Sequence, residues 1–113
     1  MATRKLQKGE WRPFLDRMSK VIAGSQAEIA IDSLALGHQI EAEWLPLLGI
    51  AYDPKDDLVE VALEGVDHMI SHPREIYVDD GGPMLNSLEI VDDEGTRQVI
   101  QLRRPLMLAP PSH

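Results

Sequence analysis

The chain has 113 residues, a formal net charge of -8 at pH 7 from 11 Lys and Arg against 19 Asp and Glu, and no cysteine. This length predicts a single domain, residues 1–113, because two separate cores would each bury too little surface to offset the loss of chain entropy. The lack of cysteine excludes disulfides, thiolate nucleophiles and cysteine-bound metal centres. An acidic surface repels phosphate groups, so we expect no nucleic-acid partner and no membrane partner.

Hydrophobic residues make up 43% of the chain and aromatic residues only 4%, so aliphatic side chains must fill the core. No apolar stretch approaches the ~20 residues of a membrane span, and no apolar run of signal-peptide length follows the basic start. We therefore expect a soluble cytoplasmic protein.

The first predicted element is a helix at residues 10–22, after a polar and flexible start at residues 1–9. Apolar residues recur at helical spacing in this segment, at Trp11, Phe14, Leu15, Met18 and Ile22. Pro13 fits within the first turn, where its missing N–H costs nothing, and Gly24 provides a stop. We expect this helix to cover a sheet.

Residues 26–102 are predicted to be an antiparallel β region, because apolar and polar residues alternate in short runs separated by turn residues. Strands are expected around residues 27–32, 40–44, 51–63 (as a hairpin) and 75–78. Pro46 and Gly49 predict a bulge, a sharp bend or an edge within residues 45–52. Residues 65–73 are interpreted as a loop or short helical turn, and residues 103–113 as a C-terminal tail.

The clearest signal is a hairpin at residues 88–102. A three-residue loop with Gly95 in the left-handed conformation would pair Leu88 with Ile100 and Ile90 with Gln98. This register places Leu88, Ile90, Ile100 and Leu102 on a core face. It leaves Val91 and Val99 on the opposite face.

The most suggestive chemical pair is His68 and His72, whose spacing of four would place two imidazoles on one face of a helix. Pro73 opposes a helix there. Acidic residues at positions 53, 56, 57, 79, 80, 92, 93 and 94 could add oxygen ligands, but they also suit turns. No serine nucleophile motif and no phosphate-binding loop occurs. We assign no catalytic residue and no cofactor, and we favour a protein that is not an enzyme.

Surplus apolar surface is the feature that bears most on function. Val91 and Val99 face away from the predicted core, and the tail adds Leu106, Met107 and Leu108. The helix, the tail or a second chain could cover this surface, or the chain could close fully around its own core. We predict a small non-enzymatic protein-interaction domain with a protein partner or a homodimer. The alternative is a small-molecule or metal-binding protein, possibly an enzyme, that uses His68, His72 and nearby aspartates.

Several short motifs in a fixed order also suggest a family. They are Glu10-Trp11 with Phe14-Leu15, then Leu45-Pro46-Leu47 with Gly49-Ile50, Asp53, His68-x-Ile70 with Pro73, Leu88-x-Ile90 and Asp93-x-Gly95. In this order they resemble a family of small uncharacterised bacterial proteins, a domain of unknown function. The resemblance implies a stand-alone bacterial domain and gives no residue a catalytic role.

The order of the elements is also similar to that of Sm-like and SH3-like small barrels, by layout and not by motif. The RNA-binding role of some such barrels is not expected here, because the chain is acidic. We predict an α+β fold, mainly β, in which the N-terminal helix packs on a curled five- to six-stranded antiparallel sheet or a small, partly open barrel.

Overall fold

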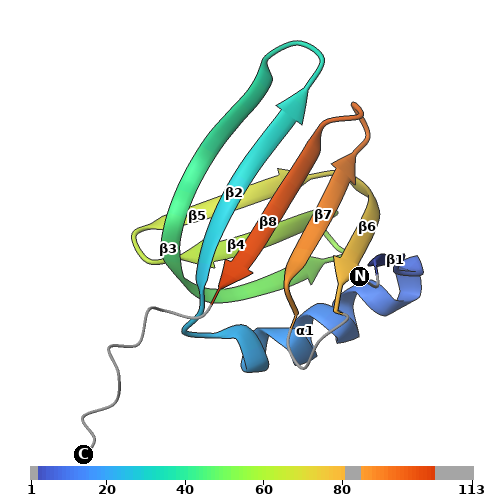
Figure 1. Ribbon diagram of the computed structural model, residues 1–113. Helices are drawn as coiled ribbons and strands as arrows, with labels where there is room; N and C mark the ends of the chain where they lie inside the picture. Colours follow the sequence, from blue (N-terminus) through green and yellow to red (C-terminus); the bar gives the residue numbers. More distant parts are fainter. Residues whose placement is uncertain (1–2, 81–84, 104–113) are drawn as a thin grey trace, which may run out of the picture.

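The structure, a computed structural model, describes residues 3–80 and 85–103. In chain order its elements are β1 (Thr3–Lys5), the 3-10 helix η1 (Lys8–Glu10), α1 (Trp11–Ile22), β2 (Gln26–Ser33), β3 (Gly37–Asp53), β4 (Leu58–Leu63), β5 (Val66–Ser71), β6 (Pro73–Asp79), β7 (Ser87–Asp92) and β8 (Arg97–Arg103). The strands form one antiparallel eight-stranded sheet in the order β1-β6-β7-β8-β2-β3-β4-β5 (Figure 1). The predicted class, α+β and mainly β, is confirmed.

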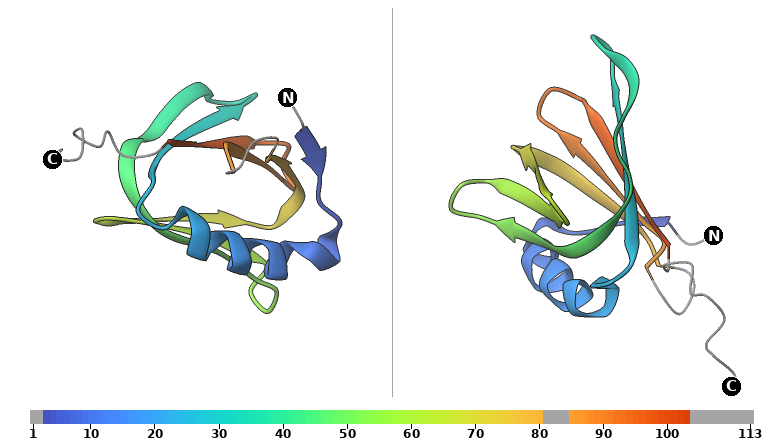
Figure 2. Two further views of the ribbon diagram at one scale, coloured as in Figure 1. Left: turned by 60° about the horizontal axis from the view of Figure 1, so that its bottom comes forward. Right: turned by 90° about the vertical axis from the view of Figure 1, so that its left-hand side faces the viewer.

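The long strand β3 belongs to two halves of this sheet. Residues 37–46 of β3 pair with β2, whereas residues 47–53 pair with β4. We call β1, β6, β7, β8, β2 and residues 37–46 the front half, and residues 47–53, β4 and β5 the back half. The two halves curl toward each other, and α1 lies across one end (Figures 1 and 2). The sheet is not closed into a barrel.

Bulges in β3 produce the bend between the two halves. The register of β3 shifts twice against β2, on either side of Ile29, and once against β4, between Leu47 and Gly49. Trp44 has a φ of 52°, a left-handed conformation that is strained for a large side chain. Because bulges bend and twist a strand, β3 can turn from one half into the other. The bulge or bend predicted for residues 45–52 is confirmed.

Helix α1 covers the side of residues 47–53 that β2 leaves unpaired. The Ile50 N–H donates to Ser19 Oγ at 2.9 Å, so a helix side chain satisfies a backbone donor that no described strand pairs. The helix ends where Gly24, with a φ of 92°, turns the chain toward β2. Its buried face contributes Trp11, Phe14, Leu15 and Ile22 to the core.

The core lies between the two halves and is mostly aliphatic. The inward residues of β7 and β8 pair with those of the neighbouring strands, and Ile29, Ile76, Leu88, Ile90 and Ile100 are all fully buried. From the back half, Val59 and Val61 of β4 face them and are equally buried. Burial of this apolar surface is the main source of stability.

The predicted hairpin at residues 88–102 is confirmed as β7 and β8. Leu88 pairs with Ile100 and Ile90 with Gln98. The Asp92 N–H donates to the Thr96 carbonyl at 3.0 Å, and Gly95 has a φ of 81°. Local turn chemistry was therefore enough to predict the register.

Two predicted segments differ from the structure. Residues 66–71, interpreted as part of a loop or helical turn, form β5, which pairs with β4 along its whole length. Residues 3–9, expected to be flexible, include β1 and the start of η1; Leu6 is only 2% exposed and its N–H donates to the Ile76 carbonyl. These additions explain why the sheet has eight strands instead of the five to six expected.

Within residues 3–80 and 85–103, no helix is both long enough and apolar enough to cross a membrane.

Candidate interaction site

Among the described residues, the sheet has three unpaired edges: the outer side of β1, the outer side of β5, and the side of residues 37–46 of β3 that faces away from β2. An unpaired strand exposes backbone N–H and C=O groups that can bind another chain. Natural proteins protect such edges with charges, bulges or very short strands. The three edges differ in this protection.

Two of the edges carry such protection. Strand β1 has three residues, and its Arg4 and Lys5 form ion pairs with Asp80 at 3.1 Å and Glu75 at 3.0 Å. The edge of β3 has the bulges described above and two exposed carboxylates, Glu41 and Glu43. Both edges are therefore poor sites for addition of a strand.

The β5 edge lacks these features. Its six residues pair with β4 without a bulge, from Val66 opposite Leu63 to Ser71 opposite Leu58. No described strand pairs with its other side. The strand contains one acidic residue, Asp67, and no Lys or Arg.

Exposed apolar side chains lie on both faces of β5. Val66 is 49% exposed and shares the inward face with buried Ile70, whereas Met69 is 47% exposed on the outward face, opposite Glu60 of β4. Asp67 also lies on that outward face. A strand added here would meet Val66, His68 and Ile70 on the inward face, and a mixture of Met69 and carboxylates on the outward face.

The structure places His68 and His72 in different surroundings. His68 lies on the inward face of β5, and its Nε2 donates to Oε1 of Gln98 in β8, a side chain that is 7% exposed. His72 follows β5 with a φ of 55°, and its Nδ1 lies 3.4 Å from Asp57 Oδ2. Because residues 66–71 form a strand, the spacing of four no longer places the two imidazoles one turn apart, as a helix would.

His72 belongs to a polar cluster at the corner between β5 and β6. The Tyr52 hydroxyl donates to Asp57 Oδ1 at 2.9 Å, and the His72 N–H donates to the Asp57 carbonyl at 2.9 Å. The hydrogen bond from Tyr52 lowers the pKa of Asp57, and burial raises the pKa of Tyr52. These bonds hold Asp57 and His72 in left-handed conformations, with φ values of 50° and 55°. The cluster therefore connects the β3–β4 turn to the corner between β5 and β6.

The acidic turn residues satisfy backbone groups. Asp53 Oδ1 accepts from the Lys55 N–H at 2.9 Å, and Asp92 Oδ1 accepts from the N–H groups of Glu94 and Thr96 at 2.9 and 3.0 Å. In the described part of the chain, no group of three or more His, Asp or Glu side chains is arranged to hold a metal ion.

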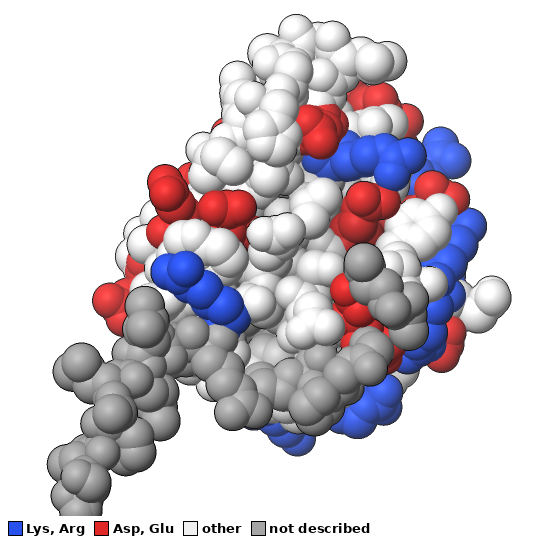
Figure 3. Space-filling model, viewed as in Figure 1, with Lys and Arg blue, Asp and Glu red and all other residues white. Residues whose placement is uncertain are grey.

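Val91 and Val99 lie on the outward face of the front half, as the register predicted, and both are partly buried. Charged side chains flank them: Arg97 is opposite Val91, Glu89 is opposite Val99, and Arg97 and Glu89 form an ion pair at 2.8 Å. Leu106, Met107 and Leu108 lie outside the described residues. Figure 3 shows this face, with uncharged groups at its centre and basic groups along the side of β6 and β1.

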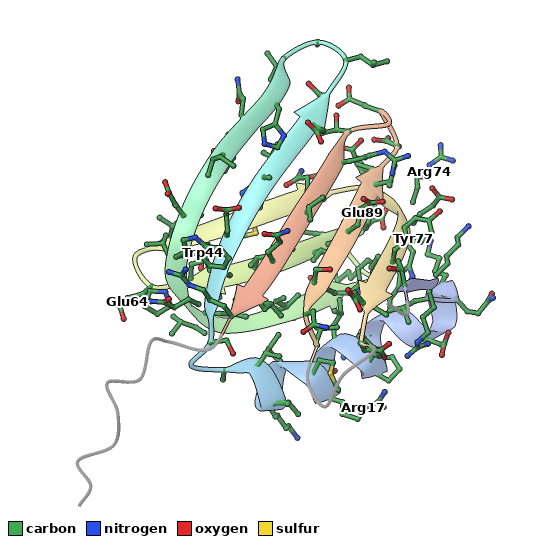
Figure 4. All side chains as sticks on the ribbon, in the orientation of Figure 1. Arg17, Trp44, Glu64, Arg74, Tyr77 and Glu89 are labelled. Carbon is green, nitrogen blue, oxygen red and sulfur yellow. The ribbon has the colours of Figure 1, made fainter. Side chains whose placement is uncertain are left out.

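Trp44 is a second feature of the outward face. The Arg103 guanidinium lies 4.0 Å from the centre of the Trp44 ring, and the Arg103 Nε donates to Gln26 Oε1 at 3.0 Å. Figure 4 shows Trp44 at the β3 side of this face and Tyr77 at the β6 side. Arg103 thus fixes the end of β8 beside β2 and β3.

Sequence reasoning missed the projecting tip of the β2–β3 hairpin, which we call the arm tip (residues 33–40). Leu34 is 108% exposed, Leu36 66% and Ile40 47%. The arm tip extends beyond the rest of the sheet and is largely uncharged (Figures 1 and 3). The signal was two leucines, Leu34 and Leu36, between the strands predicted around residues 27–32 and 40–44, where polar residues are usual.

It also missed a groove of about 660 Å³ between α1 and the outward face of β3 and β4, which we call the α1–β4 groove. Asp16, Ser19, Lys20 and Ala23 line its helix side, and Leu48, Gly49, Ile50, Ala51, Glu60 and Ala62 line its sheet side. Small outward residues along β3 and β4 are the only sequence signal for it, and the position of α1 cannot be read from them.

Two comparisons with known proteins give a match. Residues 2–111 match a family described as "Family of unknown function (DUF5335)". The chain is also similar to an "Uncharacterized protein" of Aquifex aeolicus (strain VF5), with 38% identity over 109 residues, which cover 96% of this chain and 98% of that protein. No solved structure matches the chain.

Proposed function

The chain belongs to DUF5335, a family of unknown function, and we propose that it is a non-enzymatic protein-binding module that accepts an extended segment of a partner protein at the β5 edge. The observation that carries this proposal is the contrast among the three unpaired edges. Strand β5 is regular and six residues long, whereas β1 is short and the β3 edge is bulged and acidic. Strand addition uses backbone hydrogen bonds for affinity and alternate side chains for specificity.

The surroundings of β5 define the chemistry of the partner. On the inward face, an added strand would lie beside Val66 and Ile70, and beside His68, whose Nε2 already donates to Gln98, so apolar residues are favoured there. On the outward face it would lie beside Asp67 and Met69, with Glu60 one strand further, so Lys or Arg is favoured. The partner segment therefore alternates apolar and basic residues.

This chemistry favours a different protein over a second copy of the chain. Two copies with a net charge of -8 each repel one another. Sedimentation velocity should accordingly show a monomer, and a dimer abolished by charges on β5 would contradict this choice of partner. We also propose a cytoplasmic location, consistent with the acidic composition and testable by cell fractionation.

The test is selection from a random peptide library displayed on phage, followed by affinity measurements with a synthetic peptide from the enriched set. We expect enrichment of peptides that alternate apolar and basic residues. The variant Val66→Lys/Met69→Lys adds two charges at partly exposed positions, and its affinity should fall about tenfold or more, equivalent to at least about 1.4 kcal/mol.

The matched control is Leu34→Lys/Leu36→Lys, which makes the same charge change on the exposed arm tip. Its affinity should remain close to that of the unmodified protein. Equal loss in both variants, or enrichment of no peptide, would refute binding at β5.

A further inference from the structure

We propose that the C-terminal segment of this chain, residues 104–113, occupies the α1–β4 groove. This inference concerns a different surface from β5 and does not depend on the proposed function. It rests on the shape of the groove, the place where the described chain ends, and the chemistry of the segment.

The groove has the size and lining of a site for a short apolar segment. Its volume of about 660 Å³ lies within the range typical of ligand pockets. Ala51 and Ala62 leave room above the sheet because their side chains are small, and Leu48, 61% exposed, stands beside them. A Leu or Met side chain placed there would bury apolar surface on both partners.

The groove runs along α1, and one of its ends lies close to the end of β8. The Gly24 N–H donates to the Leu47 carbonyl at 3.0 Å, which places the last turn of α1 beside the Leu48 end of the groove. Gln26, two residues further along, pairs with Arg103, the last described residue. Figures 1 and 2 show the end of β8 near the end of α1. The following residues therefore start near the Ala23 and Leu48 end.

The segment is long enough to fill the groove. Ten residues can extend up to about 33 Å at roughly 3.3 Å per residue. The helix side of the groove, from Asp16 to Ala23, spans only about 10 Å at 1.5 Å per residue. The first residues can thus reach the entrance while the apolar ones lie within the groove.

The chemistry of the segment complements the lining. It contains the run Leu106, Met107, Leu108 and Ala109 and no acidic residue, and it begins with Arg104. The groove offers apolar groups, and its charged lining consists of two carboxylates, Asp16 and Glu60, and one ammonium group, Lys20. Pro105, Pro110 and Pro111 favour an extended backbone, which lowers the entropy lost on binding.

Covalent attachment favours this occupant over any other. A short linker gives an effective concentration in the millimolar range, so the segment competes well with free peptides at micromolar concentration. The groove would then be closed to other ligands as long as the segment remains bound.

A spin label tests the proposal directly, because the chain has no cysteine and Ser112→Cys provides a single labelling site. In the full chain, we expect the label to broaden the amide signals of Leu48, Ala51 and Ala62. The substitution Leu106→Asp/Leu108→Asp should restore most of their intensity. The control Leu36→Asp, on the arm tip, should leave the broadening unchanged.

Three results would overturn the proposal. They are no broadening at the groove, broadening that persists in Leu106→Asp/Leu108→Asp, and strong broadening at residues 66–71 instead. Mixing spin-labelled protein with isotope-labelled, unmodified protein identifies the source of the segment. Broadening that persists in this mixture would show that a second copy provides it, which also contradicts the inference.

Discussion

The contact between α1 and β3 at Gly49 gives a prediction whose magnitude follows from the structure. A Cβ atom at position 49 would lie 2.8 Å from Ser19 Oγ, which is closer than real Cβ contacts allow. The same Oγ accepts the Ile50 N–H at 2.9 Å. Gly49→Ala must therefore displace either the helix or the hydroxyl, and the second change breaks the hydrogen bond.

We expect Gly49→Ala to lower the free energy of unfolding by about 1–3 kcal/mol, the range for overpacking or for a partly buried donor left unpaired. Ser19→Ala removes the acceptor and should cost about 1–2 kcal/mol. In the double variant the Ser19 hydroxyl is absent, so Gly49→Ala adds little to the cost of Ser19→Ala. The loss of unfolding free energy in the double variant should therefore be about 1 kcal/mol smaller than the sum of the two single losses. Urea unfolding followed by tryptophan fluorescence measures all four proteins. Additive costs, or a neutral Gly49→Ala, would refute this account of how α1 covers β3.

Three further predictions concern single sites. Gly95 has a φ of 81° and a Cβ added there would meet open space, so Gly95→Ala should cost about 1 kcal/mol in urea unfolding, from backbone strain alone, and Gly95→Asn less. The hydrogen bond from the Tyr52 hydroxyl lowers the pKa of Asp57 in the folded protein. Asp57 therefore stabilises the fold above its unfolded pKa of about 3.9, and this stabilisation is lost as the pH falls through the lower pKa of the folded protein. Tyr52→Phe should therefore lose less stability than the unmodified protein between about pH 6 and about pH 3, and an identical pH profile would contradict the assignment. His68→Leu leaves the buried Gln98 without its partner and should lower the free energy of unfolding by about 1–3 kcal/mol. Adding Gln98→Leu in the same chain should restore part of this loss. Stoichiometric zinc or nickel found by elemental analysis of the unmodified protein, and lost in His68→Leu, would instead support the metal-binding alternative.

The sequence predicted those parts of the fold that depend on neighbouring residues. The register of β7 and β8 follows from the alternation of apolar residues around Asp93, Glu94 and Gly95. The helix follows from apolar spacing between Pro13 and Gly24. In both cases the local pattern and the three-dimensional contacts agree.

Strand β5 was missed although a local signal for it exists. Leu63 pairs with Val66 across the two-residue turn Glu64-Gly65, and Gly65 has a φ of 83°. A Gly at such a turn is typical of a tight hairpin. Met69 on the outward face and His68 on the inward face obscured the alternation, and Pro73 suggested a loop.

The open edges and the groove could not be predicted from local patterns. They depend on where β3 changes its partner from β2 to β4, and on the side of β3 that α1 covers. Val91 and Val99 were correctly assigned to the outward face, but their exposure depends on Arg97 and Glu89, which the sequence pattern does not place. Unpaired strand edges are properties of the whole sheet.

Amide hydrogen exchange tests the central claim most directly. The measurement compares the protein alone with the protein saturated by a peptide selected from the library. Strand addition predicts slower exchange within residues 66–71, because amides on the free side of β5 gain backbone partners. Unchanged exchange in β5, with protection confined to the arm tip or to the α1–β4 groove, would contradict it.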